Sequence, residues 1–215
     1  MDMKNLALSI VTGAIVLSSG AGIVSTSGEA ASGSTLAVAV KDDNGMPVRD
    51  AVVMVYPAAG ISGGSYQFAG NGIMQQRNIQ FDPGTLIVAK GTTVRFPNRD
   101  RVRHNVYSFS KAAKFTMKLY GKDQSRSQKF AIAGTVALGC NIHDEMQGFI
   151  KVVDTPFAAK TDHNGLLKIG GLPGGFARVK VWHPKNRVRG GENGYSFSVG
   201  ASGVTKKTVS LKLRS

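Results

Sequence analysis

Residues 139–152, "GCNIHDEMQGFIKV", contain the only cysteine of the chain, one of its four histidines and a methionine. Cys140, His143 and Met146 follow the spacing C-x2-H-x2-M, so that one tight loop can turn all three side chains inward. A thiolate, an imidazole and a thioether are soft or borderline ligands, which suit copper better than calcium or magnesium. Segments typical of strands flank the loop, at 127–140 and 148–154. The stretch therefore predicts a metal-binding loop between two β-strands.

A second imidazole must come from elsewhere, because a blue-copper site places two imidazoles and a thiolate in a trigonal plane with a weak axial methionine. The chain offers His104, His163 and His183. His104 is favoured because it begins a predicted strand in "FPNRDRVRHNVYSFS", residues 96–110. His163 lies in an Asp-His-Asn-Gly turn and His183 precedes a proline, which favours structural roles for both over a second metal site.

The alternative to a metal site is that Cys140 and Met146 fill a core and His143 is an ordinary loop histidine. The coincidence of all four ligands at this spacing favours the metal. Asp144 and Glu145 could act as an acid–base pair, but the sequence indicates no nucleophile or substrate pocket beside them. We expect these two carboxylates to lie on a solvated loop.

Outside this loop the sequence is typical of an all-β protein. Its 27 glycines, β-branched runs and turn signals about every ten residues predict a β-sandwich. "STLAVAVKDDNGMPVRDAVVMVYPA", residues 34–58, gives two apolar runs separated by an Asp-Asn-Gly turn, which predicts a strand, a turn and a strand. A helical period is almost absent.

Two longer stretches, "VRFPNRDRVRHNVYSFS" (94–110) and "VALGCNIHDEMQGFIKVVDTP" (136–156), resemble the cupredoxins of the plastocyanin and amicyanin type. They are also similar to the plastocyanin-like proteins labelled methylamine utilization proteins. The resemblance implies a Greek-key cupredoxin sandwich over residues 72–155 and one type 1 copper ion. It further implies His104 and His143 as imidazole ligands, Cys140 as the thiolate, Met146 as the axial ligand, and Asn105 as the side chain that ties the two ligand-bearing segments together. Asn141 and Ile142 depart from the family, because many cupredoxins have a proline between the cysteine and the histidine.

The flanks resemble the two parts of one carboxypeptidase-regulatory-like domain. "VKDDNGMPVRDAVVMVY" (40–56) is similar to its opening, and "TDHNGLLKIGGLPGGFARVKVWHP" (161–184) to its later part. We therefore expect residues 35–60 and 158–213 to form a small second β-sandwich, split by the copper-binding segment. Insertions are tolerated where the two ends of a loop are close and exposed.

Residues 1–30 are typical of a secretory signal peptide: Lys4 precedes an apolar run, and small residues precede a cleavage point after Ala30. Retention of this segment as a membrane anchor is the alternative. We expect a cleaved, periplasmic protein without membrane insertion. A lone thiol outside the cell must be held by a metal, buried in a core or paired with another chain.

The chain is strongly basic, with 27 Lys and Arg against 13 Asp and Glu, a net charge of +14. Such a charge favours acidic partners, anionic lipid or nucleic acid, and export argues against nucleic acid. Several basic side chains lie close to His104 in the sequence: Arg95, Arg99, Arg101, Arg103, Lys111 and Lys114. Alternation on a strand would put Arg99, Arg101 and Arg103 on one side, and a loop is the alternative for this stretch.

These observations predict a monomeric electron carrier with an acidic redox protein as its partner. We do not expect an enzyme, because four protein ligands leave no open position for a substrate. Two alternatives stay open: a protein that binds and delivers copper itself, and a cell-envelope interaction module whose copper site is vestigial.

Overall fold

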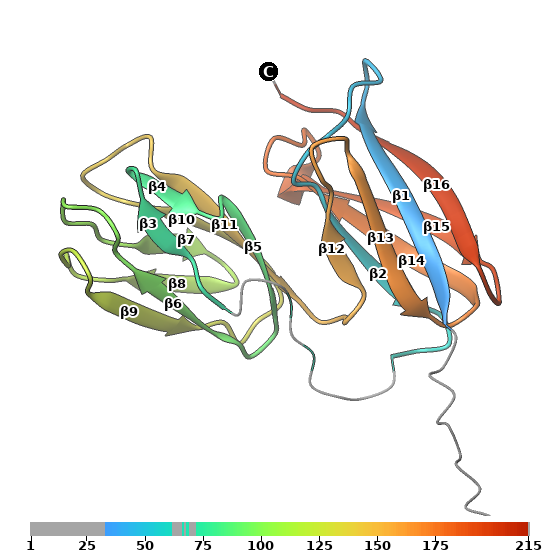
Figure 1. Cartoon of the computed structure of the whole chain (residues 1–215), viewed down its shortest axis with the longest axis horizontal. Coiled ribbons are helices and arrows are strands. Elements are labelled where there is room, and N and C mark those ends of the chain that lie inside the picture. Colours follow the sequence, from blue (N-terminus) through green and yellow to red (C-terminus); the bar gives the residue numbers. More distant parts are fainter. Residues whose placement is uncertain (1–32, 62–65, 67, 69–71, 215) are drawn as a thin grey trace, which may run out of the picture. The chain divides into compact units, whose positions relative to one another are not determined.

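The computed structural model describes residues 33–61, 66, 68 and 72–214 (Figure 1). The expected signal peptide, residues 1–30, lies outside the described residues. Apart from one 3-10 turn, η1 (Arg189–Gly191), every regular element in the described residues is a β-strand. No helix in this part of the chain is long and apolar enough to cross a bilayer. The predicted all-β fold class is confirmed.

The middle of the chain forms one β-sandwich, which we call the central sandwich (Figure 1). Its five-stranded sheet has the order β5-β11-β10-β7-β8, with β5 parallel to β11, and β6 pairs with β9. β3 and β4 form a hairpin that is joined to β6 by isolated bridges. Neighbours in the sheet are often distant in sequence, as in a Greek key. The strands are β3 (Gln75–Arg77), β4 (Gln80–Asp82), β5 (Thr85–Ala89), β6 (Thr93–Pro97), β7 (Tyr107–Ser110), β8 (Ala113–Thr116), β9 (Ser125–Lys129), β10 (Gly134–Gly139) and β11 (Gln147–Val153).

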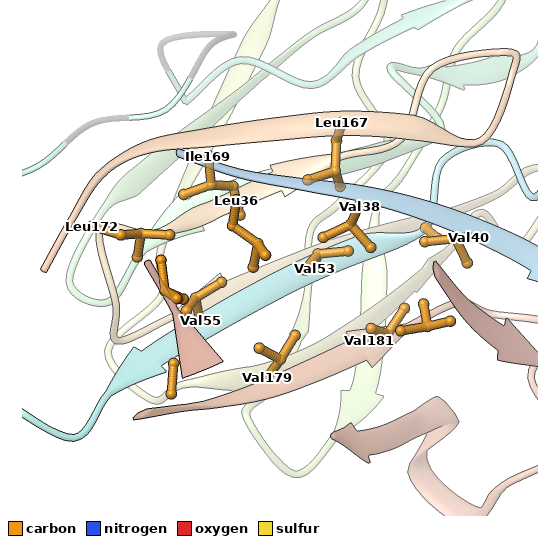
Figure 2. Packing of buried hydrophobic residues seen from close by; sticks show 14 of the residues in the cluster. Leu36, Val38, Val40, Val53, Val55, Leu167, Ile169, Leu172, Val179 and Val181 are labelled. Atoms are coloured by element: carbon orange, nitrogen blue, oxygen red, sulfur yellow. The ribbon is translucent and has the colours of Figure 1, made fainter. Parts of the chain in front are cut away.

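The N- and C-terminal segments form a second β-sandwich, which we call the terminal sandwich. Its sheets have the orders β13-β1-β16 and β12-β2-β14-β15. Alternate residues of β1 are buried, and Figure 2 shows Leu36, Val38 and Val40 among the branched side chains of the other strands. This alternation is the sequence pattern that predicted the strand. The strands are β1 (Ser34–Asp42), β2 (Val52–Pro57), β12 (Ala158–Lys160), β13 (Leu166–Leu172), β14 (Gly175–Trp182), β15 (Glu192–Val199) and β16 (Val204–Leu211).

Two connections of the central sandwich bring the candidate ligands together. β10 pairs with β7 at Gly139 and Tyr107, so the residue after β10 and the residues before β7 lie at the same end of the sheet. His104 is fixed there by a bridge to Tyr120. The loop from β10 to β11 folds back on itself, because the Met146 N–H donates to the His143 carbonyl at 2.9 Å.

Candidate metal centre

The structure places His104, Cys140 and His143 in one group. The Cys140 Sγ lies 3.6 Å from the His143 Nδ1 and 3.9 Å from the His104 Nδ1. The two imidazole rings have centroids 4.8 Å apart. His104 and Cys140 are buried, whereas His143 is half-buried. Within the part of the chain that the structure describes, this is the group of histidine, cysteine and carboxylate side chains that is close enough to hold a metal ion.

The separations of the sulfur from the two imidazole nitrogens fit a single ion. Metal–sulfur bonds of about 2.3 Å and metal–nitrogen bonds of about 2.0 Å, set about 120° apart, put sulfur and nitrogen about 3.7 Å from each other. The observed separations of 3.6 and 3.9 Å lie on either side of this value. These two separations are compatible with one ion bound to the sulfur and to both nitrogens, since all three atoms lie within 4.8 Å of one another.

Met146 lies on the same loop as Cys140 and His143 and is the candidate for a fourth donor. It is 1% exposed and belongs to the same buried cluster as Cys140. Both residues also line a surface groove that runs beside β7 and β10. A thioether in this position could serve as a weak axial ligand.

Asn105 links the two segments that carry the candidate ligands. Its Oδ1 accepts a hydrogen bond from the Asn141 N–H at 2.8 Å and lies 3.5 Å from the Cys140 Sγ. One buried amide thus joins the loop before β7 to the first residues after β10. This is the position that the cupredoxin resemblance implies for it.

Asp100 was missed by the sequence reasoning, which treated its neighbourhood as a run of arginines. Its Oδ2 lies 2.8 Å from the His104 Nε2, and the backbone N–H groups of Asn78 and Ile79 also donate to its carboxylate. Burial alone would raise the pKa of Asp100, but the hydrogen bonds from Ile79, His104 and Asn78 hold this pKa below its usual value. The signal in the sequence was a carboxylate four residues before a candidate ligand.

The other histidines lie apart from this group. His163 is exposed in its turn, where its Nε2 is 3.1 Å from the Asn164 side chain. The His183 Nδ1 accepts from the Lys185 N–H at 3.3 Å. Asp144 and Glu145 are exposed on the ligand loop, in agreement with a solvated position.

The arginines before His104 lie in a loop, so strand alternation does not place them on one side. Residues 98–106 connect β6 to β7 without forming a strand. Arg99, Arg101 and Arg103 are all exposed, and Arg99 pairs weakly with Asp123 at 3.5 Å. Three exposed apolar side chains accompany them near the candidate ligands: Val102, Leu119 and Ile142.

Neither a family model nor a curated protein matches the chain. Among solved structures, the chain is similar to a reduced Cu(I) form of an amicyanin mutant at pH 4 and to an oxidised form of another amicyanin mutant. Each has 24% identity and a TM-score of 0.36, and the match covers 48% of this chain and 99% of the other. The likeness spans half of the chain, and the assignment of the site rests on the geometry given above.

Proposed function

We propose that the chain is an exported type 1 copper protein that carries single electrons between redox partners. The observation that carries this proposal is the approach of the Cys140 Sγ to two imidazole nitrogens, at 3.6 and 3.9 Å, with Met146 buried in the same cluster as Cys140. Copper held there would supply a one-electron couple. A thiolate, imidazole and thioether set lies between the preferences of Cu(I) and Cu(II), so the protein ligands need to move little between the two states.

The burial of the donors supports a carrier rather than an enzyme. His104, Cys140 and Met146 are almost fully enclosed, and the four side chains together would fill the coordination of one ion. His143 is the member of the set that is half-buried. The electron would enter and leave through its imidazole edge.

The surface near the ligands supports an acidic protein partner. Arg101 and Arg103 are exposed close to His104 in the sequence, and Val102 and Ile142, each next to one of the two ligand-bearing segments, are exposed apolar side chains, with exposed fractions of 43% and 51%. Exposed positive charge near the ligands favours a transient complex with an acidic surface. Residues 94–110 and 136–156 resemble methylamine utilization proteins, which agrees with electron transfer between proteins outside the cytoplasm. We expect the protein to act there as a monomer.

Electrochemistry with a Cu(I) chelator tests the carrier against a copper-delivery protein, which would use the same ligands. The loaded protein is cycled repeatedly between Cu(II) and Cu(I), and the copper that stays with the protein is measured after each cycle. A carrier gives a reversible one-electron wave and keeps its metal. Transfer of the ion to the chelator at each reduction would contradict the proposal and support delivery. Cys140→Ser serves as the control that lacks the thiolate.

A further inference from the structure

Asp100 and His104 form a buried carboxylate–imidazole pair on the loop between β6 and β7. The Asp100 Oδ2 lies 2.8 Å from the His104 Nε2, and the exposed fractions of the two side chains are 12% and 0%. A carboxylate oxygen at this distance accepts a hydrogen bond from the N–H that a neutral imidazole carries at Nε2. The Nδ1 of His104, the atom that faces Cys140, is then left with its lone pair free.

The hairpin of β3 and β4 holds the other side of the Asp100 carboxylate. The Asn78 N–H donates to Oδ1 at 2.7 Å and the Ile79 N–H donates to Oδ2 at 3.0 Å. Both residues have a φ of 56°, in the left-handed region. This conformation costs roughly 1–2 kcal/mol for a non-glycine residue and is least suited to a β-branched one. A β-branched residue kept in it suggests that the orientation of these two N–H groups matters.

Asn98 fixes the backbone of the same loop from within. It is fully buried, and its Nδ2 donates to the carbonyls of Val102 and Tyr120 at 2.8 and 3.1 Å. Its Oδ1 accepts from the Asp100 N–H at 2.8 Å. Asp100 is therefore held at its backbone and at its carboxylate before any metal binds.

We propose that Asp100 is a positioning residue that fixes the tautomer and the ring orientation of His104 and strengthens its Nδ1 as a metal donor. The negative charge of the carboxylate, passed on through the hydrogen bond to His104, would stabilise bound Cu(II) more than Cu(I) and so lower the reduction potential. The redox consequence rests on the proposed function. The effect on the imidazole does not, because it exists in the metal-free protein.

Two variants separate the hydrogen bond from the charge. Asp100→Ala removes the acceptor of the His104 proton, and Asp100→Asn keeps a neutral acceptor of nearly the same shape. Asp123→Asn is the matched control: it removes the same charge from an exposed side chain that pairs with Arg99 and forms no ion pair with His104.

Nitrogen-15 NMR of the metal-free protein at neutral pH tests the positioning role. The proposal predicts that His104 in the wild-type chain holds its proton on Nε2 with slow exchange. In Asp100→Ala the exchange accelerates and both tautomers appear, whereas Asp123→Asn matches the wild type. A proton on Nδ1 in the wild-type chain, or unchanged exchange in Asp100→Ala, would overturn the proposal.

The reduction potential of the copper-loaded protein tests the role of the charge. Asp100→Asn should weaken the preference for Cu(II) over Cu(I) by about tenfold, at the lower end of the effect of such partners on metal affinity. For one electron this is a rise of about 59 mV. If the reduction potential rises by the same amount in Asp123→Asn, the effect comes from the net charge of the protein. That result would overturn the proposed role of the Asp100 charge. If copper gives no thiolate band at all, the proposed function fails, while the NMR result still decides the role of Asp100.

Discussion

At the scale of single residues, the candidate site depends on side chains whose polar atoms each have a defined partner. Asn105 shows this most clearly, because its Oδ1 accepts from the Asn141 N–H at 2.8 Å and also lies 3.5 Å from the Cys140 Sγ. This amide holds the thiol-bearing loop against the segment that carries His104. The positions of the two ligand-bearing segments are therefore set by hydrogen bonds within the protein.

Asn105→Ala should loosen the site without removing a ligand. The Asn141 N–H loses its acceptor, so the free energy of unfolding should fall by about 1–2 kcal/mol. Copper affinity should fall about 10- to 100-fold, because the ligand loop is no longer held. Urea unfolding and competition with a copper chelator measure these effects. Asn44→Ala, in an exposed turn, is the control, and equal results for the two variants would refute the linking role.

Met146→Leu should change the redox potential more than the binding of copper. Leucine fills nearly the same buried volume but offers no thioether, so oxidised copper loses its weak axial donor. We expect an intact thiolate band and a higher reduction potential, measured by visible spectroscopy and voltammetry on the same sample. A variant that no longer binds copper would show that Met146 holds the metal instead of tuning it.

The residues of the site were predictable to different degrees for a physical reason. Cys140, His143 and Met146 could be found because soft ligand types at fixed spacing are visible in a single sequence. His104 could be found because it stands before a segment with a strand pattern, although β7 begins only at Tyr107. Asp100 could not, because its role depends on how the loop at 98–106 and the β3–β4 turn meet. A sequence shows residue types and spacing, but not which backbone N–H groups converge on a carboxylate.

At the scale of elements, the contact between β7 and β10 sets the distance between the two ligand-bearing segments. Gly139 lies directly opposite Tyr107, and a Cβ on Gly139 would meet the Tyr107 ring at 2.5 Å. A real Cβ contact is never this short, so the ring occupies the space that the missing side chain leaves. The glycine before the cysteine makes room for the Tyr107 ring, and its backbone dihedrals do not call for a glycine.

Gly139→Ala should therefore push Tyr107 and β7 away from β10. We expect a loss of about 1–3 kcal/mol in the free energy of unfolding, as for other overpacked sites, and weaker copper binding because the segment with His104 moves. Chemical denaturation checks the first effect and metal titration the second. Gly121→Ala, where a Cβ has nothing within 4 Å, is the control. Restored stability in the double variant with Tyr107→Ala would confirm the clash, and a neutral Gly139→Ala would refute it.

The loop before His104 shows where the prediction of elements from sequence stops. Arg99, Arg101 and Arg103 alternate with other residues, as they would on a strand, yet the structure has a loop there. The buried side chain of Asn98 binds the carbonyls of Val102 and Tyr120 and so takes the place of a strand partner. Side-chain hydrogen bonds of this kind compete with sheet formation and leave little trace in a periodic pattern.

At the scale of the whole molecule, strand alternation predicted the fold class, but the pairing required the structure. β1 lies between β13 and β16, whose residues follow it by more than a hundred positions, and it is parallel to β16. The order of motifs in the flanks indicated that the ends of the chain belong together. No local sequence pattern predicts that Val38 of β1 pairs with Leu167 of β13. This register is set by the packing of the shared core.

The basic surface near the ligands should govern the rate of encounter with a partner. We predict an acidic redox partner and a bimolecular electron-transfer rate that falls steeply with added salt, because screening acts over about 8 Å at physiological ionic strength. Replacing both Arg101 and Arg103 with serine should slow the reaction by about tenfold at low salt and leave the copper spectrum intact. Stopped-flow kinetics at several ionic strengths measure this.

The matched control removes the same charge from the terminal sandwich, by replacing the exposed Lys168 and Lys206 with serine. It should slow the reaction much less than the arginine pair. Equal slowing by the two double variants would show that net charge alone matters. A rate that changes neither with salt nor when Arg101 and Arg103 are replaced would contradict the prediction. The two arginines would then serve only to keep the protein soluble.

The visible absorption spectrum of the Cu(II)-loaded protein tests the central claim most directly. If the Cys140 thiolate and the imidazoles of His104 and His143 hold one copper ion, the protein should be intensely coloured by thiolate-to-copper charge transfer, and Cys140→Ser should abolish the band. A protein that binds copper in a 1:1 ratio but stays colourless, with a spectrum that Cys140→Ser does not alter, would contradict the account.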